Sequence, residues 1–286
     1  MANFILSAFA DEAAGSLEEQ IEVLEQEGIH MIELRGVDGV NCADLSIEQA
    51  EAIKQKLDEH HITLSALGSP YGKIGIGDDF KEHLERFKKS LEICKILDCK
   101  RIRMFSFYYP EQEGAGQYRK EVLSRLEQMV KLAEEAGVLL AHENEKGIYG
   151  DIDSRCMDLY QHFGGRLGVI FDPANYIQCG VQPLEAYDLQ KETITYFHMK
   201  DALMEDGSVV SVGNGDGHVP EILADVNKRI QGEVILTIEP HLHVFDGLSK
   251  LQDEQLKHKE SYRTSREAFH AACEAVKNCI GKLEEN

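Results

Sequence analysis

The chain has 286 residues, of which 43% are hydrophobic and 28% are charged, and its formal net charge is −21. A chain of this length can bury a large core without disulfides or structural metals. Because so acidic a surface repels nucleic-acid phosphates and anionic lipids, we expect neither a nucleic acid nor a membrane as a partner.

Cysteine usage and the N-terminal sequence indicate a cytoplasmic protein. The seven cysteines are odd in number and no two have Cys-x-x-Cys spacing, which favours reduced thiols. The opening sequence MANFILSAFADEAAG has a short apolar run without a basic lead, as in a strand rather than a signal peptide. No run approaches the roughly 18 apolar residues of a membrane span.

Short runs typical of β-strands alternate with amphipathic helical patterns along the chain. The runs are NFILSAFA (3–10), MIEL (31–34), ITLSAL (62–67), RIRMFSF (101–107), VLLAHE (138–143), LGVIFD (167–172), TITYFHM (193–199) and EVILTIE (233–239). The first helical pattern covers residues 16–28, with Ser16 suited to the N-cap and Gly28 to the C-cap. Residues 46–60 and 121–137 repeat the pattern.

Eight strand-then-helix units without a linker predict an α/β fold, a single (β/α)8 TIM barrel over residues 1–286. An additional long C-terminal helix, at about residues 253–282, is expected to pack on the barrel or on a partner subunit, so a homo-oligomer is possible. A doubly wound open sheet is the alternative. It is disfavoured because no G-x-G-x-x-G follows the first strand.

Four consecutive predicted strands end in a side chain that can bind a metal. The side chains are Glu143, Asp172, His198 and Glu239, although Glu145 has the same parity as Glu143 and could replace it. The carboxyl ends of barrel strands surround one mouth, where the catalytic residues of TIM barrels lie. Because three carboxylates meeting there would repel one another, we expect a shared site for one divalent metal ion.

The ligand types restrict the expected metal. Three oxygen donors and one imidazole favour a hard or borderline ion, with Mn²⁺ first and Mg²⁺, Co²⁺, Fe²⁺ or Zn²⁺ as alternatives. A six-coordinate ion would keep about two positions open for a substrate with adjacent oxygens. Taken singly, each strand-end carboxylate could instead be solvated, and the histidine could be structural.

The motifs IELRG, LSALGSPYG, HENEKG, FDPAN, HMKDA, GNGDGHVPEIL and IEPH follow one another in a familiar order. In this order the chain resembles the sugar phosphate isomerase/epimerase superfamily, the xylose-isomerase-like TIM barrels, over roughly residues 3–243. The resemblance implies the same four metal ligands. It also implies that Glu143 and Glu239 act as an acid/base pair, one removing a proton beside a metal-bound carbonyl and the other returning it through an enediolate.

Two positions differ from the ketose 3-epimerases that the chain resembles. Asn175 stands three residues after Asp172, where those enzymes carry a histidine, and the loop at 201–217 lacks their arginine. Both residues contact substrate oxygens in those enzymes. These differences count against a simple ketohexose 3-epimerase.

Six side chains around the expected site are candidates for substrate binding: Arg103, Lys146, Tyr149, Asn175, Lys200 and Asp201. Arg103 could instead point outward under a helix, and Lys200 and Asp201 could form a surface ion pair. Glu33 and Arg35 are expected to pair with each other.

Two glycine-rich loops are expected near the site. The loop at 68–79 is suited to covering the substrate, and GNGDG at 213–217 could bind phosphate through backbone N–H groups, although Asp216 opposes an anion there.

The first expected function is metal-dependent isomerisation or epimerisation of a small keto-sugar or related polyol. The alternative is a metal-dependent dehydratase or lyase acting on a keto-sugar or keto-inositol, because the same proton abstraction begins both reactions. An abasic-site endonuclease and a non-catalytic sugar-binding protein are weaker alternatives. The acidic net charge opposes DNA, and a sensor has no need of two candidate bases.

Overall fold

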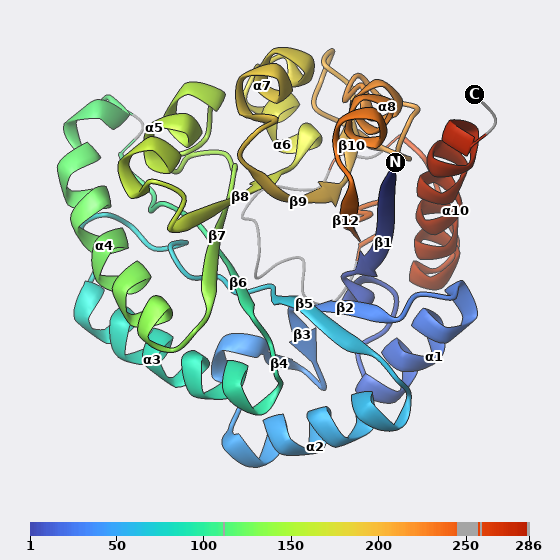
Figure 1. Cartoon of the computed structure of the whole chain (residues 1–286), viewed down its shortest axis with the longest axis horizontal. Helices are drawn as coiled ribbons and strands as arrows, with labels where there is room; N and C mark the ends of the chain where they lie inside the picture. The colour runs from blue at the N-terminus through green and yellow to red at the C-terminus, as the bar shows by residue number, and fades with distance from the viewer. Residues whose placement is uncertain (111, 245–256, 258, 285–286) are drawn as a thin grey trace.

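The computed structural model describes residues 1–110, 112–244, 257 and 259–284. Parallel strands close into a barrel in the order β1-β12-β9-β8-β7-β6-β5-β2. They are β1 (Ala2–Ala8), β2 (Met31–Leu34), β5 (Thr63–Leu67), β6 (Arg101–Met104), β7 (Leu139–Glu143), β8 (Leu167–Phe171), β9 (Ile194–Met199) and β12 (Gly232–Ile238). Figure 1 shows these strands inside a ring of helices, so the predicted TIM barrel is confirmed.

Helices surround the barrel. They are α1 (Leu17–Glu27), α2 (Ile47–Glu59), α3 (Phe80–Ile96), α4 (Arg119–Glu135), α5 (Asp153–Phe163), α6 (Pro173–Gln178), α7 (Pro183–Gln190) and α8 (Val219–Arg229). The predicted caps of α1 are confirmed. The Ser16 side chain accepts a hydrogen bond from the Glu19 N–H, and Gly28 ends the helix in the left-handed conformation with φ 67°.

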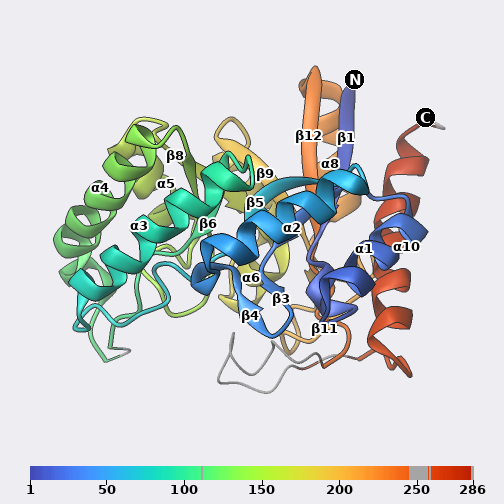
Figure 2. The same cartoon turned by 90° about the horizontal axis from the view of Figure 1, so that it is seen from below.

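The C-terminal helix α10 (Ser265–Glu284) completes the helical ring. It packs against α8 and α1, and Figure 2 shows it running beside α1. It therefore covers the β1 side of the barrel, where an eighth outer helix is needed. Of the helical stretch predicted at 253–282, residues 253–256 and 258 lie outside the described residues. Residues 259–264 are not helical, so the prediction is wrong there and the helix begins at Ser265.

Short elements lie in the loops. They are the hairpin strands β3 (Gly36–Val37) and β4 (Val40–Asn41), the hairpin strands β10 (Asp201–Ala202) and β11 (Val209–Val210), and the 3-10 turns η1 (Ala10–Glu12), η2 (Cys42–Asp44) and η3 (Ala115–Gln117). None of the helices in the described residues has the length and apolar character needed to cross a bilayer.

The strand predicted at 101–107 is shorter than expected. β6 ends at Met104, and the next residues leave the barrel to bond with the loop after β5. The Phe105 N–H donates to the Tyr71 carbonyl at 2.7 Å, and the Phe107 N–H donates to the Gly72 carbonyl at 2.9 Å. Gly72 permits this contact because a Cβ on it would lie 2.0 Å from the Phe105 oxygen. The loop at 68–79 is thus tied to the mouth of the barrel.

The barrel interior determines where the strand-end side chains point. Ala66, Ala141, Ile170 and Tyr196 form a buried cluster inside the barrel. Side chains alternate along a strand, so residues two positions later face the same interior, one layer nearer the carboxyl ends. For Ala141, Ile170 and Tyr196, those residues are three of the four predicted ligands.

Candidate metal and substrate site

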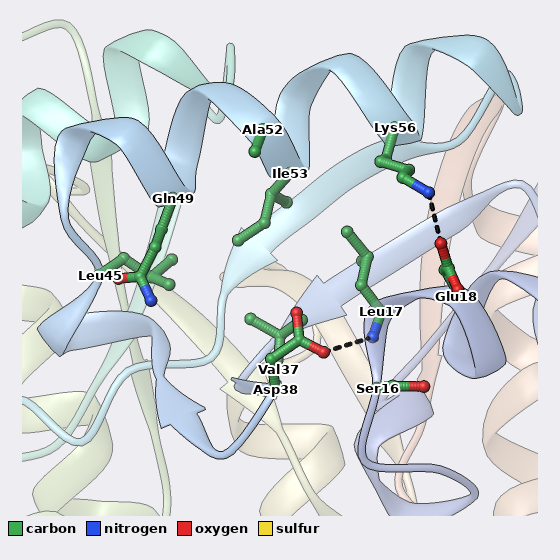
Figure 3. Close-up of a pocket in the computed structure, with 10 residues that line it drawn as sticks. All are labelled: Ser16, Leu17, Glu18, Val37, Asp38, Leu45, Gln49, Ala52, Ile53 and Lys56. Carbon is green, nitrogen blue, oxygen red and sulfur yellow. Dashed lines mark hydrogen bonds and ion pairs between the residues drawn. The ribbon is translucent and has the colours of Figure 1, made fainter.

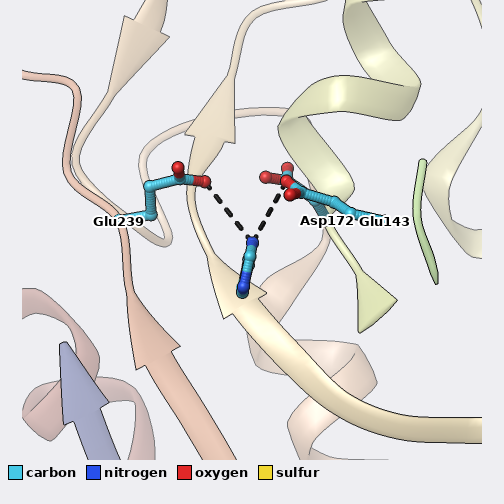
Figure 4. Close-up of side chains that lie close together, drawn as sticks. Glu143, Asp172 and Glu239 are labelled. Atoms are coloured by element: carbon cyan, nitrogen blue, oxygen red, sulfur yellow. Dashed lines mark ion pairs between the residues drawn. The ribbon is translucent and has the colours of Figure 1, made fainter. Parts of the chain in front are cut away.

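Four elements bring the predicted ligands together. Glu143 ends β7, Asp172 follows β8, His198 lies in β9 and Glu239 follows β12. One ligand atom from each lies within 4.8 Å of the others, and all four side chains are buried. Figure 4 shows the three carboxylates gathered at the carboxyl ends of their strands.

Each carboxylate directs one oxygen toward this cluster. His198 Nδ1 lies 3.1 Å from Glu143 Oε1 and 3.5 Å from Glu239 Oε2. Asp172 Oδ1 caps α6 by accepting from the Asn175 N–H at 2.9 Å, which leaves Oδ2 for the cluster. His198 Nδ1 and Asp172 Oδ2 are buried and make no hydrogen bond within the described residues, and Asp172 Oδ2 forms an ion pair with Lys200 Nζ at 2.8 Å. Buried lone pairs aimed at two further carboxylates suit a divalent cation.

Glu33 orients the imidazole of His198. Its Oε2 lies 3.2 Å from His198 Nε2, and its Oε1 accepts from the Tyr196 hydroxyl at 3.1 Å. Against the effect of burial, Glu143 and Glu33 raise the pKa of His198, so Nδ1 has to lose its proton before it can bind a cation. A proton kept on Nε2 by Glu33 then leaves the Nδ1 lone pair facing the cluster, as in the carboxylate–histidine pairs behind many protein metals. The predicted pairing of Glu33 with Arg35 is therefore wrong, because Glu33 contacts His198 instead.

Glu33→Gln is expected to weaken metal binding about 10- to 100-fold without removing a ligand, because the amide supports the His198 tautomer less well. Competition with a fluorescent chelator would measure the metal affinity. An affinity equal to that of the wild-type protein would mean that Glu33 does not orient His198.

Cationic side chains surround the cluster on its open side. A narrow pocket is lined by Arg35, Lys73, Arg103, Glu143, Glu145, Lys200, Glu239 and His241. Lys200 Nζ lies 2.8 Å from Asp172 Oδ2 and 3.0 Å from Glu239 Oε2. Arg103 Nη1 lies 3.2 Å from Glu143 Oε2. The ammonium and the guanidinium partly balance the acidic cluster.

Arg35 bonds to Oε1, the second carboxylate oxygen of Glu239. It donates from Nη1 to Glu239 Oε1 at 3.1 Å, from Nη2 to Glu12 Oε1 at 3.0 Å and from Nε to Asp11 Oδ2 at 2.9 Å. Burial raises the pKa of Glu12 to about 8 despite the neighbouring Arg35. His241 adds its backbone N–H to Glu12 Oε2 at 2.7 Å. Sequence reasoning did not identify Glu12, whose only signal was its place just after the first strand.

The two sides of the cluster differ electrostatically. Burial raises the pKa of Asp172 to about 7, against the opposing charge of Lys200. Burial acts in the same direction on Glu143, but His198 and Arg103 outweigh it and hold the pKa of Glu143 at about 2. Glu143 is therefore ionised at neutral pH.

The predicted substrate-binding residues divide into two groups. Arg103 and Lys200 line the pocket, and Asn175 donates to Glu143 Oε1 at 3.1 Å. Lys146 is exposed, and the Tyr149 hydroxyl donates to Asp158 Oδ2 at 2.7 Å. Neither of the last two lines the pocket.

Glu143, not Glu145, belongs to the four-residue cluster. Glu145 also lines the pocket, where its Oε2 accepts from Lys73 Nζ of the loop after β5 at 2.7 Å. The two glutamates have the same parity, so only the structure could separate them.

Asp201 organises the glycine loop rather than facing the pocket. Its buried carboxylate accepts from the backbone N–H groups of Gly213, Gly215 and Gly217 at 2.8 to 3.1 Å. A Cβ on Gly215 would lie 2.2 Å from Asp201 Oδ1, so this close approach requires glycine. Because Asp201 already occupies these N–H groups, they are not available to a phosphate.

Asp201→Ala is expected to lower the free energy of unfolding by about 2–4 kcal/mol, since several buried N–H donors lose their acceptor together. Urea denaturation followed by circular dichroism would measure the change. Asp188→Ala, on the exposed face of α7, is the control and should change it by about 0.5 kcal/mol or less. Equal effects would contradict the role of Asp201 in the loop.

A second hollow lies outside the barrel between α1 and α2 (Figure 3). Its floor is apolar, with Leu17, Val37 and Ile53 among the lining residues. Its acidic groups already have partners: Glu18 Oε1 accepts from Lys56, and Asp38 Oδ1 accepts from the Leu17 N–H. The groups suited to chemistry therefore lie at the barrel mouth.

A family model described as xylose isomerase-like TIM barrel matches residues 21–267. The chain belongs to this family. No curated protein matches the chain. The resemblance inferred from the sequence motifs is thereby confirmed at the level of the family.

Several solved structures share the fold of nearly the whole chain. The IOLI protein with a bound zinc atom has a TM-score of 0.76 and 18% identity, over 98% of this chain and 99% of that chain. A D-tagatose 3-epimerase-like protein has a TM-score of 0.73 and 17% identity, over 98% of both chains. The probable 3-DHS dehydratase AsbF of Bacillus anthracis has a TM-score of 0.73 and 14% identity, over 97% and 99%. At these identities the likeness shows the fold alone.

Proposed function

We propose that the protein is a metal-dependent isomerase or epimerase acting on a small keto-sugar or related polyol. The observation that carries the proposal is the placement of Glu143 and Glu239 on either side of His198 Nδ1, at 3.1 and 3.5 Å. Two carboxylates that lie on opposite sides of a bound substrate carbon can remove a proton from one face of that carbon and return it to the other. The D-tagatose 3-epimerase-like relative is consistent with this reaction class.

The four clustered residues would hold one divalent ion, with Mn²⁺ as the first candidate. When bound, such an ion supplies positive charge beside a carbonyl oxygen that becomes negative as the neighbouring carbon loses its proton. The zinc atom in the IOLI protein supports a divalent metal in this fold, without fixing its identity here.

The side chains around the cluster would determine which oxygen of Glu143 can act as the base. Glu143 Oε1 faces His198 and Asn175, whereas Oε2 faces Arg103 and the pocket. Oε2 is thus the oxygen that can reach a substrate proton. Because a carboxylate bound by a guanidinium is a weak base, Arg103 has to transfer to a substrate oxygen before Glu143 acts.

A dehydratase is the second candidate, and the contents of the pocket favour it specifically. Lys200 lines the pocket beside Glu239, where its ammonium could protonate a departing hydroxyl after the first proton is removed. The AsbF relative is described as a probable dehydratase. An endonuclease has no comparable support, because the net charge of −21 opposes DNA. The free cysteines fit a cytoplasmic enzyme.

The test is solvent exchange in D₂O with Mn²⁺-loaded protein and a panel of keto-sugars, followed by NMR. Deuterium at the carbon beside the carbonyl, with an epimer or isomer as the product, is expected. Deuterium with loss of water would favour the dehydratase. No exchange on any keto-sugar by fully loaded protein would overturn both.

A further inference from the structure

The pocket beside the cluster is rich in hydrogen-bond donors. Four of its lining residues, Arg35, Lys73, Arg103 and Lys200, are cations that donate and cannot accept. They come from loops or strand ends on different sides of the mouth. A ligand that enters the pocket therefore meets ammonium and guanidinium groups on several sides.

Each carboxylate oxygen on the pocket wall already accepts at least one hydrogen bond. In Glu143, Oε1 accepts from Asn175 and Oε2 from Arg103. In Glu145, Oε1 accepts from the Lys146 N–H and Oε2 from Lys73. In Glu239, Oε1 accepts from Arg35 and Oε2 from Lys200.

Some of the donors, by contrast, remain unused. Arg103 Nε is buried without a hydrogen-bond partner in the described part of the chain. Lys73 Nζ has three N–H groups, and Glu145 Oε2 is its one acceptor within the described residues. A carboxylate accepts several hydrogen bonds and donates none, so groups that only donate suit it better than they suit a hydroxyl, which also has a proton to donate.

Lys73 and Arg103 lie against the same aromatic ring. Lys73 Nζ is 4.3 Å and the Arg103 guanidinium carbon is 5.1 Å from the centroid of Phe105. Neither residue belongs to the four-residue cluster, so an anion between them would not use the expected metal positions. Lys73 is 12% exposed and lies in the loop after β5, where an incoming group can displace Glu145.

We propose that the substrate is an acidic sugar. Its carboxylate binds Lys73 and Arg103 while its keto group lies at the four-residue cluster. This inference rests on the proposed function, because it assigns a substrate class to the same site. It goes beyond that function by favouring keto-uronates over neutral ketoses.

The test is isothermal titration calorimetry of Mn²⁺-loaded protein with two matched pairs: D-fructuronate against D-fructose, and D-tagaturonate against D-tagatose. The members of each pair differ in whether carbon 6 is a carboxylate or a hydroxymethyl group. One charge-assisted contact predicts about tenfold or greater preference for the uronate in at least one pair.

Lys73→Gln is expected to lower the uronate affinity about tenfold and to lower the affinity for the matched ketose by less, so that the preference within each pair falls. Lys89→Gln, on the exposed face of α3, is the matched control and should change neither. Equal or tighter binding of the neutral ketoses would overturn the acidic substrate, and solvent exchange on those ketoses would show that the proposed function survives. Absence of binding by all four sugars, with no exchange, would overturn both proposals.

Discussion

Glu143→Gln and Glu239→Gln are each expected to lower turnover about 10²- to 10⁴-fold, the usual contribution of a positioned acid or base. The amide keeps the shape of each side chain and one oxygen for the cluster, but it cannot accept a proton. Turnover should be measured on the sugar that gives the fastest solvent exchange, at metal concentrations that saturate each variant. This separates loss of the base from loss of the metal.

The two variants should differ from each other in a way that a purely structural role would not produce. The variant that lacks the proton-abstracting glutamate should lose both exchange and turnover. The variant that lacks the returning glutamate should still exchange the substrate proton with solvent while it forms little product. Identical losses of both rates in the two variants would contradict the assignment of one carboxylate to each face of the substrate.

Arg35→Met is expected to lower the free energy of unfolding by about 3–5 kcal/mol. The buried guanidinium bonds to Asp11, Glu12 and Glu239, so its removal leaves these acidic side chains without the cation that they share. Urea denaturation in the presence of a chelator would measure the loss, so that metal binding does not enter the comparison.

Two companion variants make this prediction specific. Adding Asp11→Asn to Arg35→Met should recover about 1–2 kcal/mol, because one of the uncompensated carboxylates is removed. Arg166→Met is the surface control and should lower the free energy of unfolding by about 1 kcal/mol or less, although Arg166 contacts both Glu127 and Glu134. A loss at Arg35 no larger than at Arg166 would mean that the buried network does not stabilise the fold.

The sequence was sufficient to predict the barrel because hydrophobic alternation and strand ends are local signals. The same alternation placed Glu143, Asp172 and His198 one layer above the buried cluster at Ala141, Ile170 and Tyr196. Parity could not distinguish Glu143 from Glu145.

Contacts between residues that lie far apart in the sequence could not be predicted in the same way. Glu33 lies in β2, yet it orients His198, which is 165 positions later in the chain. Its one sequence signal was a carboxylate inside the apolar run MIEL. Asp201 was expected near the substrate, but its carboxylate bonds to the loop at 213–217, because three backbone N–H groups converge on it. Such convergence depends on loop conformation, which composition does not encode.

The most direct test of a metal site at Glu143, Asp172, His198 and Glu239 is elemental analysis of wild-type protein beside His198→Ala after loading with Mn²⁺ and desalting. We predict about one ion per wild-type chain and a large loss in the variant, since the imidazole is the sole nitrogen ligand of the cluster. Equal metal content in the two proteins, or no metal in either, would contradict the site.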